Sequence, residues 1–143
     1  AALDALTEAG IRIVEVPLNS PRAFESLRIF VERSGTDVLI GAGTVLLPEE
    51  AAQVAEIGAR LMVAPNMDPS VIATAGGLGL ATLPGVATPS EAVAALKAGA
   101  DGLKLFPGEM LKANVLKAWR AVLPPDTLLV PVGGVTAEAM AEY

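Results

Sequence analysis

The 143-residue sequence contains no cysteine and no histidine, and only 3% of its residues are aromatic. Without cysteine, the chain can form neither a disulfide framework nor a thiol nucleophile. Without histidine, it cannot build a Ser-His triad, and it lacks the ligand that most catalytic zinc sites use. Any chemistry must therefore come from lysine, arginine, carboxylates and backbone groups.

Positive charge and long apolar runs are also scarce. Ten Lys and Arg residues face 16 Asp and Glu residues, and the formal net charge of −6 argues against a nucleic-acid surface. Hydrophobic residues make up 52% of the chain, yet no run reaches the roughly 18–20 residues of a membrane span. No charged and apolar leader opens the sequence. We therefore expect a cytoplasmic protein with neither nucleic acid nor membrane as a partner.

Six short apolar runs predict strands, and helical patterns fill the intervals between them. The predicted strands are Ile11–Val16, Val38–Ile40, Leu61–Ala64, Leu80–Leu83, Leu103–Phe106 and Leu128–Val132. The chain begins in a predicted helix, Ala1–Ala9, and stops in another, Ala137–Tyr143. Strands that alternate with helices predict a parallel sheet with right-handed crossovers.

Helix ends carry their own signals. Gly10, Gly58 and Gly99 each follow a predicted helix, where a left-handed residue closes the last turn. Prolines fit the first helical position at Pro21, Pro48, Pro69 and Pro89. Asp68 is a predicted N-cap, and the segment 88–91 has the spacing of a capping box.

The alternation fits both an open doubly wound sheet and a closed barrel. No G-x-G-x-x-G opens a helix after a strand, which weakens the dinucleotide-binding reading. Polar or special residues instead recur at the ends of several strands, as barrel enzymes require. A complete (β/α)8 TIM barrel has eight strands. With six, residues 1–143 are predicted to be a single barrel domain that lacks its first and last strands, truncated or unresolved at both ends.

Lys104 is the one lysine of four that falls in a predicted strand. Burial disfavours the charged amine and leaves a neutral nucleophile that can attack a carbonyl. Strand alternation and the burial of both faces of a barrel strand allow Lys104 and Glu15 to lie in the interior together. A Schiff-base lysine with a proton-transfer partner is one interpretation. A lysine that snorkels to water, or a buried ion pair, is the alternative.

Two glycine-containing segments follow strands. Gly41-Ala42-Gly43-Thr44 could hold a carboxylate through its hydroxyl, or could be a plain tight turn. Gly133-Gly134 follows the last strand and precedes a helix start at Thr136. Free N–H groups there favour an anion, and barrel phosphate sites use the loop after the seventh strand. We interpret this loop as a phosphate site, with a simple turn as the alternative.

Six motifs together resemble the 2-keto-3-deoxy-6-phosphogluconate/galactonate aldolase family, in order and spacing along essentially the whole chain. They are Val14-Glu15-Val16-Pro17-Leu18-Asn19-Ser20-Pro21, Gly41-Ala42-Gly43-Thr44-Val45, Ala64-Pro65-Asn66, Leu83-Pro84-Gly85, Leu103-Lys104-Leu105-Phe106-Pro107 and Val132-Gly133-Gly134-Val135. The resemblance implies a class I lyase with no cofactor and no metal, usually a homotrimer. It implies cleavage of a phosphorylated keto sugar acid to pyruvate and glyceraldehyde 3-phosphate.

The resemblance also implies residue roles. Lys104 matches the lysine that forms the Schiff base with pyruvate, and Glu15 matches the glutamate that shuttles protons. The substrate-binding positions match Thr44 for the pyruvate carboxylate, Pro65, Phe106, and Gly133 with Gly134 for the phosphate. Asn19 stands where gluconate-type members carry an arginine. The Leu-Asn-Ser-Pro form resembles the galactonate branch, which takes its carboxylate-binding arginine from the first strand.

Two other classes of protein fit the same residues. One is a different phosphate-binding barrel enzyme, an isomerase or epimerase, although these use two acid–base groups and only Glu15 qualifies among the carboxylates. The other is a non-catalytic barrel that binds phospho-sugars. A metal-dependent pyruvate aldolase is disfavoured because ligating histidines are absent.

Overall fold

A computed structural model describes residues 2–143, so the first residue of the predicted N-terminal helix, Ala1, lies outside the described residues. The chain alternates strand and helix throughout. Its helices are α1 (Ala2–Glu8), α2 (Ala23–Arg33), α3 (Pro48–Glu56), α4 (Pro69–Gly77), α5 (Pro89–Lys97), α6 (Ala113–Arg120) and α7 (Ala137–Met140). Its strands are β1 (Ile13–Pro17), β2 (Leu39–Gly43), β3 (Leu61–Val63), β4 (Ala81–Leu83), β5 (Gly85–Val86), β6 (Gly102–Leu105) and β7 (Leu128–Pro131).

All strand pairs are parallel, in the orders β1-β2-β3-β4 and β5-β6-β7. The two sheets are one continuous wall, because β4 and β5 are two parts of a single strand interrupted at Pro84. Lys104 N–H donates to the Pro84 carbonyl at 2.9 Å, and Ala64 N–H donates to the Leu83 carbonyl at 3.3 Å. The prediction of six parallel strands is thus confirmed, with one of them divided.

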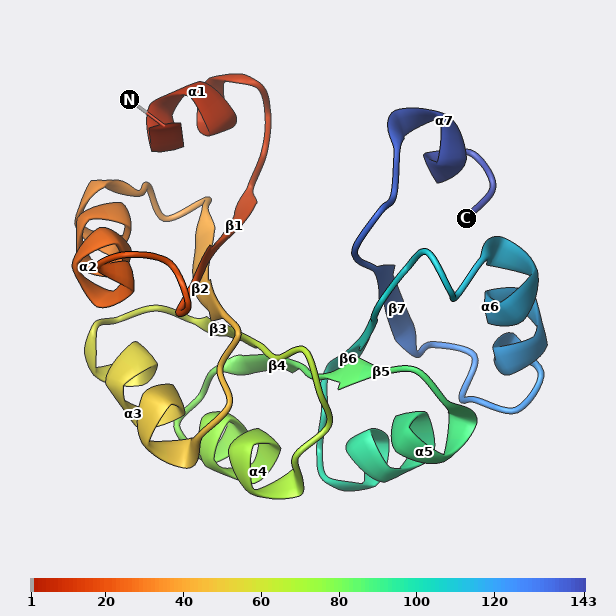
Figure 1. The fold of residues 1–143 in the computed structure, drawn as a ribbon. Coiled ribbons are helices and arrows are strands. Elements are labelled where there is room, and N and C mark those ends of the chain that lie inside the picture. Colours follow the sequence, from red (N-terminus) through yellow and green to blue (C-terminus); the bar gives the residue numbers. More distant parts are fainter. Residues whose placement is uncertain (1) are drawn as a thin grey trace.

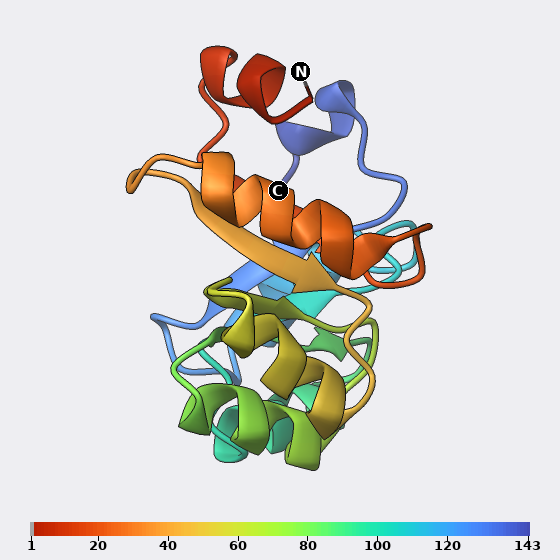
Figure 2. The ribbon, with the colours of Figure 1, turned by 90° about the vertical axis from the view of Figure 1, so that its left-hand side faces the viewer.

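The wall curves into an open arc with the helices outside it (Figure 1). Viewed from its left-hand side, α2, α3 and α4 lie in front of the strands (Figure 2). The core fills the layer between strands and helices, where Leu27, Met62, Ile72 and Leu103 are fully buried. Within residues 2–143, β1 and β7 each pair on one side only. The α/β fold is therefore an incomplete barrel, as predicted.

Most predicted helix boundaries are confirmed. Gly10, Gly58 and Gly99 have φ of +88°, +90° and +96°, the left-handed conformation that closes a helix. Asp68 caps α4 by accepting from Ser70 N–H at 2.8 Å. Thr88 and Glu91 form the predicted capping box at the start of α5.

Two boundary predictions are wrong. Pro21 is not the first residue of a helix, because it lies in a turn and α2 begins at Ala23 after a left-handed Arg22. The last helix ends at Met140 and not at Tyr143. Beyond it, the Tyr143 hydroxyl donates to the carbonyls of Gly108 and Leu111 at 3.3 and 3.2 Å.

Candidate active site

Lys104 lies in the middle of β6, with its side chain on the inner face of the wall. Leu103 and Leu105 point the other way and are fully buried against the helices, as strand alternation requires. Lys104 itself is only 8% exposed. The sequence prediction of a buried strand lysine is confirmed for the side chain as a whole. Within residues 2–143 its Nζ has no hydrogen-bond partner and is not fully buried, so the amine keeps access to solvent on the open inner face.

The surroundings of Lys104 favour a nucleophilic amine. Desolvation by burial lowers the pKa of its ammonium, and the charge of Glu15 partly opposes this by raising it. Nζ lies 4.9 Å from the centroid of the Phe106 ring. A cation over a ring face is attracted by the ring quadrupole, so Phe106 can stabilise a positive nitrogen whether it is an ammonium or an iminium.

Glu15 lies on the inner face of β1, across the arc from β6. Burial along β1 alternates, with Val14 and Val16 buried and Ile13, Glu15 and Pro17 exposed. The expectation that both faces of this strand are buried is wrong for β1, because no described strand covers its outer edge. The neighbouring strands still desolvate the carboxylate, which raises the pKa of Glu15, while Lys104 lowers it.

Glu15 and Lys104 do not form a direct ion pair in the described structure, so the predicted alternative of a buried salt bridge is also wrong. Their interaction acts through space across the arc. It raises the pKa of Lys104 and lowers that of Glu15, in each case against the effect of desolvation. Space between an amine and a carboxylate is what a substrate and a proton-carrying water would need.

The other predicted substrate-binding residues follow the carboxyl ends of β1, β2 and β3. Thr44 directly follows β2 and is half-buried, with a φ of +55°. A β-branched residue in the left-handed region is uncommon and marks a conformation held by its surroundings. Pro65 is half-buried after β3, and Asn19 is exposed in the turn after β1. The structure brings these three residues to the same end of the wall.

Gly133 and Gly134 follow β7 with φ of +93° and +64°. Among residues 2–143, neither of their N–H groups donates a hydrogen bond to protein. Consecutive free N–H groups in a turn form a concave anion site. The helix that follows, α7, is only four residues long, so the expected dipole contribution of a helix start at Thr136 is small.

Two further residues border the site, and sequence reasoning assigned a role to neither. A Cβ on Gly43 would lie 1.5 Å from Glu15 Oε2, so this carboxylate rests directly on the Gly43 backbone. A Cβ on Gly134 would lie 2.2 Å from Cγ of Glu109, whose side chain therefore covers the loop after β7. The same-face spacing of Gly41 and Gly43 was a usable signal for the first. No sequence signal pointed to Glu109.

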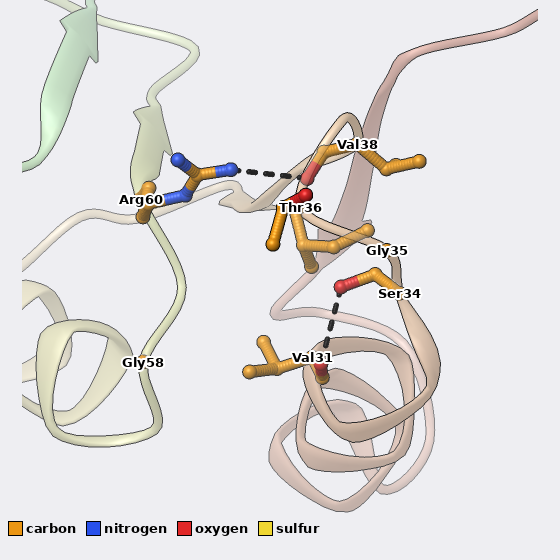
Figure 3. Close-up of a pocket in the computed structure, with 8 residues that line it drawn as sticks. Val31, Ser34, Gly35, Thr36, Val38, Gly58 and Arg60 are labelled. Atoms are coloured by element: carbon orange, nitrogen blue, oxygen red, sulfur yellow. Dashed lines mark hydrogen bonds between the residues drawn. The ribbon is translucent and has the colours of Figure 1, made fainter.

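Two other features lie apart from these residues. A pocket between α2 and the start of β2 is lined by Val31, Ser34, Thr36 and Arg60, with Arg60 donating to the Val38 carbonyl at 3.2 Å (Figure 3). It lies at the amino ends of β2 and β3 and contains no predicted site residue.

Among residues 2–143, no group of three or more carboxylates could hold a metal ion, and no helix is long and apolar enough to cross a membrane.

The fold and the site define a class of protein: a parallel α/β barrel with a desolvated lysine and a carboxylate on facing strands. The sequence model of the family described as KDPG and KHG aldolase matches residues 1–143. The chain belongs to this family.

Two curated relatives and one solved structure illustrate the match. The chain is 48% identical over 139 residues to a probable 2-dehydro-3-deoxy-6-phosphogalactonate aldolase of Rhizobium meliloti (97% of this chain, 66% of the relative). It is 45% identical over 143 residues to the 2-dehydro-3-deoxy-6-phosphogalactonate aldolase of Escherichia coli (100% and 70%). A structure described as native KDPGal superposes with a TM-score of 0.95 at 45% identity, covering 98% of this chain and 68% of that one. The chain thus spans about two thirds of the length of these relatives.

Proposed function

We propose that the protein is a class I aldolase that cleaves a 2-keto-3-deoxy-6-phospho sugar acid to pyruvate and glyceraldehyde 3-phosphate. The observation that carries this proposal is the desolvated Lys104 amine on the inner face of β6. A family member from Legionella pneumophila, 32% identical, has been captured with pyruvate as a covalent carbinolamine intermediate. Lys104 is the residue with which this chain would form the same bond.

In the proposed reaction, the neutral amine of Lys104 adds to the C2 ketone, and loss of water gives an iminium ion. Glu15, directly or through water, removes the proton of the C4 hydroxyl. The C3–C4 bond then breaks, and its electron pair moves into the iminium to give an enamine and the aldehyde. Protonation of the enamine at C3 and hydrolysis of the resulting imine release pyruvate and restore the amine.

We propose further roles from position and from the family resemblance. Thr44 holds the pyruvate carboxylate, Phe106 lies beside the iminium, and Pro65 shapes the wall next to them. Gly133 and Gly134 bind the phosphate with their free N–H groups.

Gly134→Val should raise KM for the phosphorylated substrate far more than for a non-phosphorylated analogue. Equal effects on both substrates would show that the glycines serve only the turn.

We propose the galactonate epimer as the preferred substrate. Identity is 45–48% to the two phosphogalactonate relatives but 37% to a phosphogluconate aldolase of Treponema pallidum. Asn19 also stands where the gluconate type carries arginine. Comparing kcat/KM for the two epimers tests this preference. A higher value for the gluconate epimer would contradict it.

The complete protein, we propose, carries two further β/α units that close the barrel and assembles as a cytoplasmic homotrimer. Two apolar residues on the edge strands support the closing units, because nothing in residues 2–143 covers them. Ile13 on β1 is 63% exposed and Leu128 on β7 is 57% exposed. Light scattering of the complete protein should give three times the chain mass. A monomer would contradict the assembly without affecting the reaction.

Borohydride reduction in the presence of pyruvate tests the central proposal. The protein should gain the mass of one reduced pyruvate, and peptide mapping should place it on Lys104. Lys104→Arg keeps the positive charge but cannot form the imine, so it should gain no mass and should lose activity by several orders of magnitude. Lys97→Arg, on the outer helix α5, is the matched control and should behave as the native protein does. Trapping on a lysine other than Lys104 would overturn the assignment.

A further inference from the structure

Glu15 reaches its position because Gly43 has no side chain. An ideal Cβ on Gly43 would lie 1.5 Å from Oε2, 2.4 Å from Cδ and 2.7 Å from Oε1 of Glu15. The carboxylate and a methyl group at residue 43 cannot occupy this space together. The backbone of Gly43 is not among the positive-φ residues, so its conformation would admit any residue. Only the space above its α-carbon requires glycine.

The strand register shows which way the Glu15 side chain leans. Glu15 is opposite Gly41, and Pro17 is opposite Gly43. The Glu15 carboxylate therefore extends past its own partner to lie over the residue two positions further along β2. This direction is toward the carboxyl ends of the strands, where Thr44 follows. The lean carries the carboxylate to the end of the wall at which barrel sites are built.

Gly41 shares a face with Gly43 but meets different atoms. A Cβ on Gly41 would lie 2.5 Å from Leu61 Cβ and 2.6 Å from the Leu61 carbonyl oxygen. Gly41 thus permits the close approach of β2 and β3, which is a packing role. Gly43 is the one of the two glycines that meets a catalytic side chain.

No other contact fixes the Glu15 carboxylate. Among residues 2–143, it takes part in no hydrogen bond and no salt bridge, and the charge that acts on it is that of Lys104. A carboxylate without hydrogen-bonded anchors is placed by the attraction of the opposite charge and by the shape of the surface on which it lies. The notch at Gly43 supplies that shape.

We propose that Gly43 is a positioning residue, whose missing side chain lets the Glu15 carboxylate lie where it can exchange protons with a substrate held by Lys104. This inference rests on the aldolase function proposed above. A methyl group at residue 43 would displace the carboxylate while leaving Lys104 untouched. Misplacing a catalytic group by about 1 Å can cost on the order of 100-fold in rate.

The first test compares Gly43→Ala with Gly76→Ala. Gly76 is an exposed residue of α4 whose added Cβ would meet nothing within 4 Å, so this control should keep native activity. Gly43→Ala should lower kcat about 10–100-fold while still being trapped by borohydride and pyruvate. Native kcat in Gly43→Ala would overturn the inference. Failure of the native protein itself to be trapped would instead overturn the proposed function.

A second test separates positioning from packing. In a Glu15→Ala background the carboxylate is gone, so adding Gly43→Ala should change neither the thermal stability nor the trapping yield. Shortening the side chain by Glu15→Asp should cost less activity in Gly43→Ala than in the native protein, because the shorter carboxylate avoids the methyl group. Additive effects, or a Gly43→Ala change that unfolds even the Glu15→Ala protein, would show that Gly43 serves only the sheet.

Discussion

At the scale of single residues, the site depends on two opposing influences on each titrating group. Desolvation lowers the pKa of Lys104 and raises that of Glu15, and their mutual attraction opposes both shifts. The result is an amine that loses its proton more readily than an exposed lysine and a carboxyl that holds its proton more tightly than an exposed glutamate. These are the properties that a nucleophile and a proton shuttle require near neutral pH.

Glu15→Gln should separate the rate of catalysis from the formation of the Schiff base. Loss of general acid–base catalysis should lower kcat by about 10²–10⁴-fold, whereas borohydride trapping with pyruvate should persist. Removing the carboxylate also removes the charge that raises the pKa of Lys104. The pH at which the trapping rate reaches half its maximum should therefore move to lower values than in the native protein.

Glu32→Gln, on the outer helix α2, neutralises an equivalent charge away from the site and should leave the pH midpoint unchanged. A midpoint that rises in Glu15→Gln would contradict the charge coupling. Loss of trapping together with loss of rate would assign Glu15 a different role.

Glu109 is predicted to weaken phosphate binding, because its carboxylate lies 2.5 Å from the position of a Cβ on Gly134. An anion at the free N–H groups of this loop would be repelled by that charge. Glu109→Gln keeps the shape and should lower KM for the phosphorylated substrate, with no change for a non-phosphorylated analogue. Measuring both constants in Glu142→Gln, an exposed carboxylate beyond α7, controls for net charge. A raised KM in Glu109→Gln would mean that the residue assists binding.

At the scale of elements, a polar contact joins β4 to the start of β6 where the two sheets meet. Thr82 donates from its N–H and its hydroxyl to Oδ2 of Asp101 at 2.8 and 2.9 Å, and Asp101 N–H donates back to the hydroxyl at 3.0 Å. Thr82 is only 1% exposed. Without the carboxylate, the N–H and the hydroxyl hydrogen of Thr82 would therefore lack their acceptor, while the hydroxyl oxygen would still accept from the N–H of residue 101.

Asp101→Ala should lower the free energy of unfolding by about 1–3 kcal/mol, the usual cost of buried polar groups left unpaired. Urea unfolding measures this loss. Asp126→Ala removes an exposed carboxylate from the loop before β7 and should change stability by no more than about 0.5 kcal/mol. Equal values for the two variants would show that water replaces the contact with Thr82.

Sequence patterns predicted the elements well and their limits less well. The strand cores were predictable because short apolar runs bounded by glycine and proline have few other buried arrangements. The break between β4 and β5 at Pro84 was not predictable. Proline has no N–H to donate, but whether that missing donor interrupts a strand depends on the position of the neighbouring strand. Pro21 looked like a helix start by residue type alone, but α2 begins two residues later, at Ala23, after the left-handed Arg22.

Within the site, Lys104 was predictable because a lysine between apolar strand residues is unusual. The exposure of Glu15 was not, since it depends on which strand lies beside β1. The role of Gly43 depends on the direction in which a neighbouring side chain leans, and that of Glu109 on the fold of two loops. Contacts between distant segments leave little trace in local sequence.

At the scale of the molecule, the uncovered edges of β1 and β7 should promote association of the 143-residue chain. Unpaired strand edges recruit other strands, and a lysine on an edge suppresses this. Ile13→Lys, on the inner face of β1, should reduce this association. Light scattering should then show a smaller rise in mean particle mass with protein concentration than in the native chain. Ile29→Lys, on α2 with a side chain 44% exposed, adds the same charge away from an edge and should have a smaller effect. Equal effects would assign the association to overall charge.

Because Glu15 and Lys104 are far apart along the chain, the effect of each on the pKa of the other reports whether the strands between them are assembled. The two residues come from β1 and β6, so their electrostatic interaction exists only when all the intervening strands hold the arc in shape. A partly folded chain with β5, β6 and β7 assembled would still shield the lysine, but it would lack the carboxylate. A chain in which β5, β6 and β7 are assembled but β1 is not should therefore react with pyruvate with the Glu15→Gln pH profile, and the native profile should return only when β1 joins the arc.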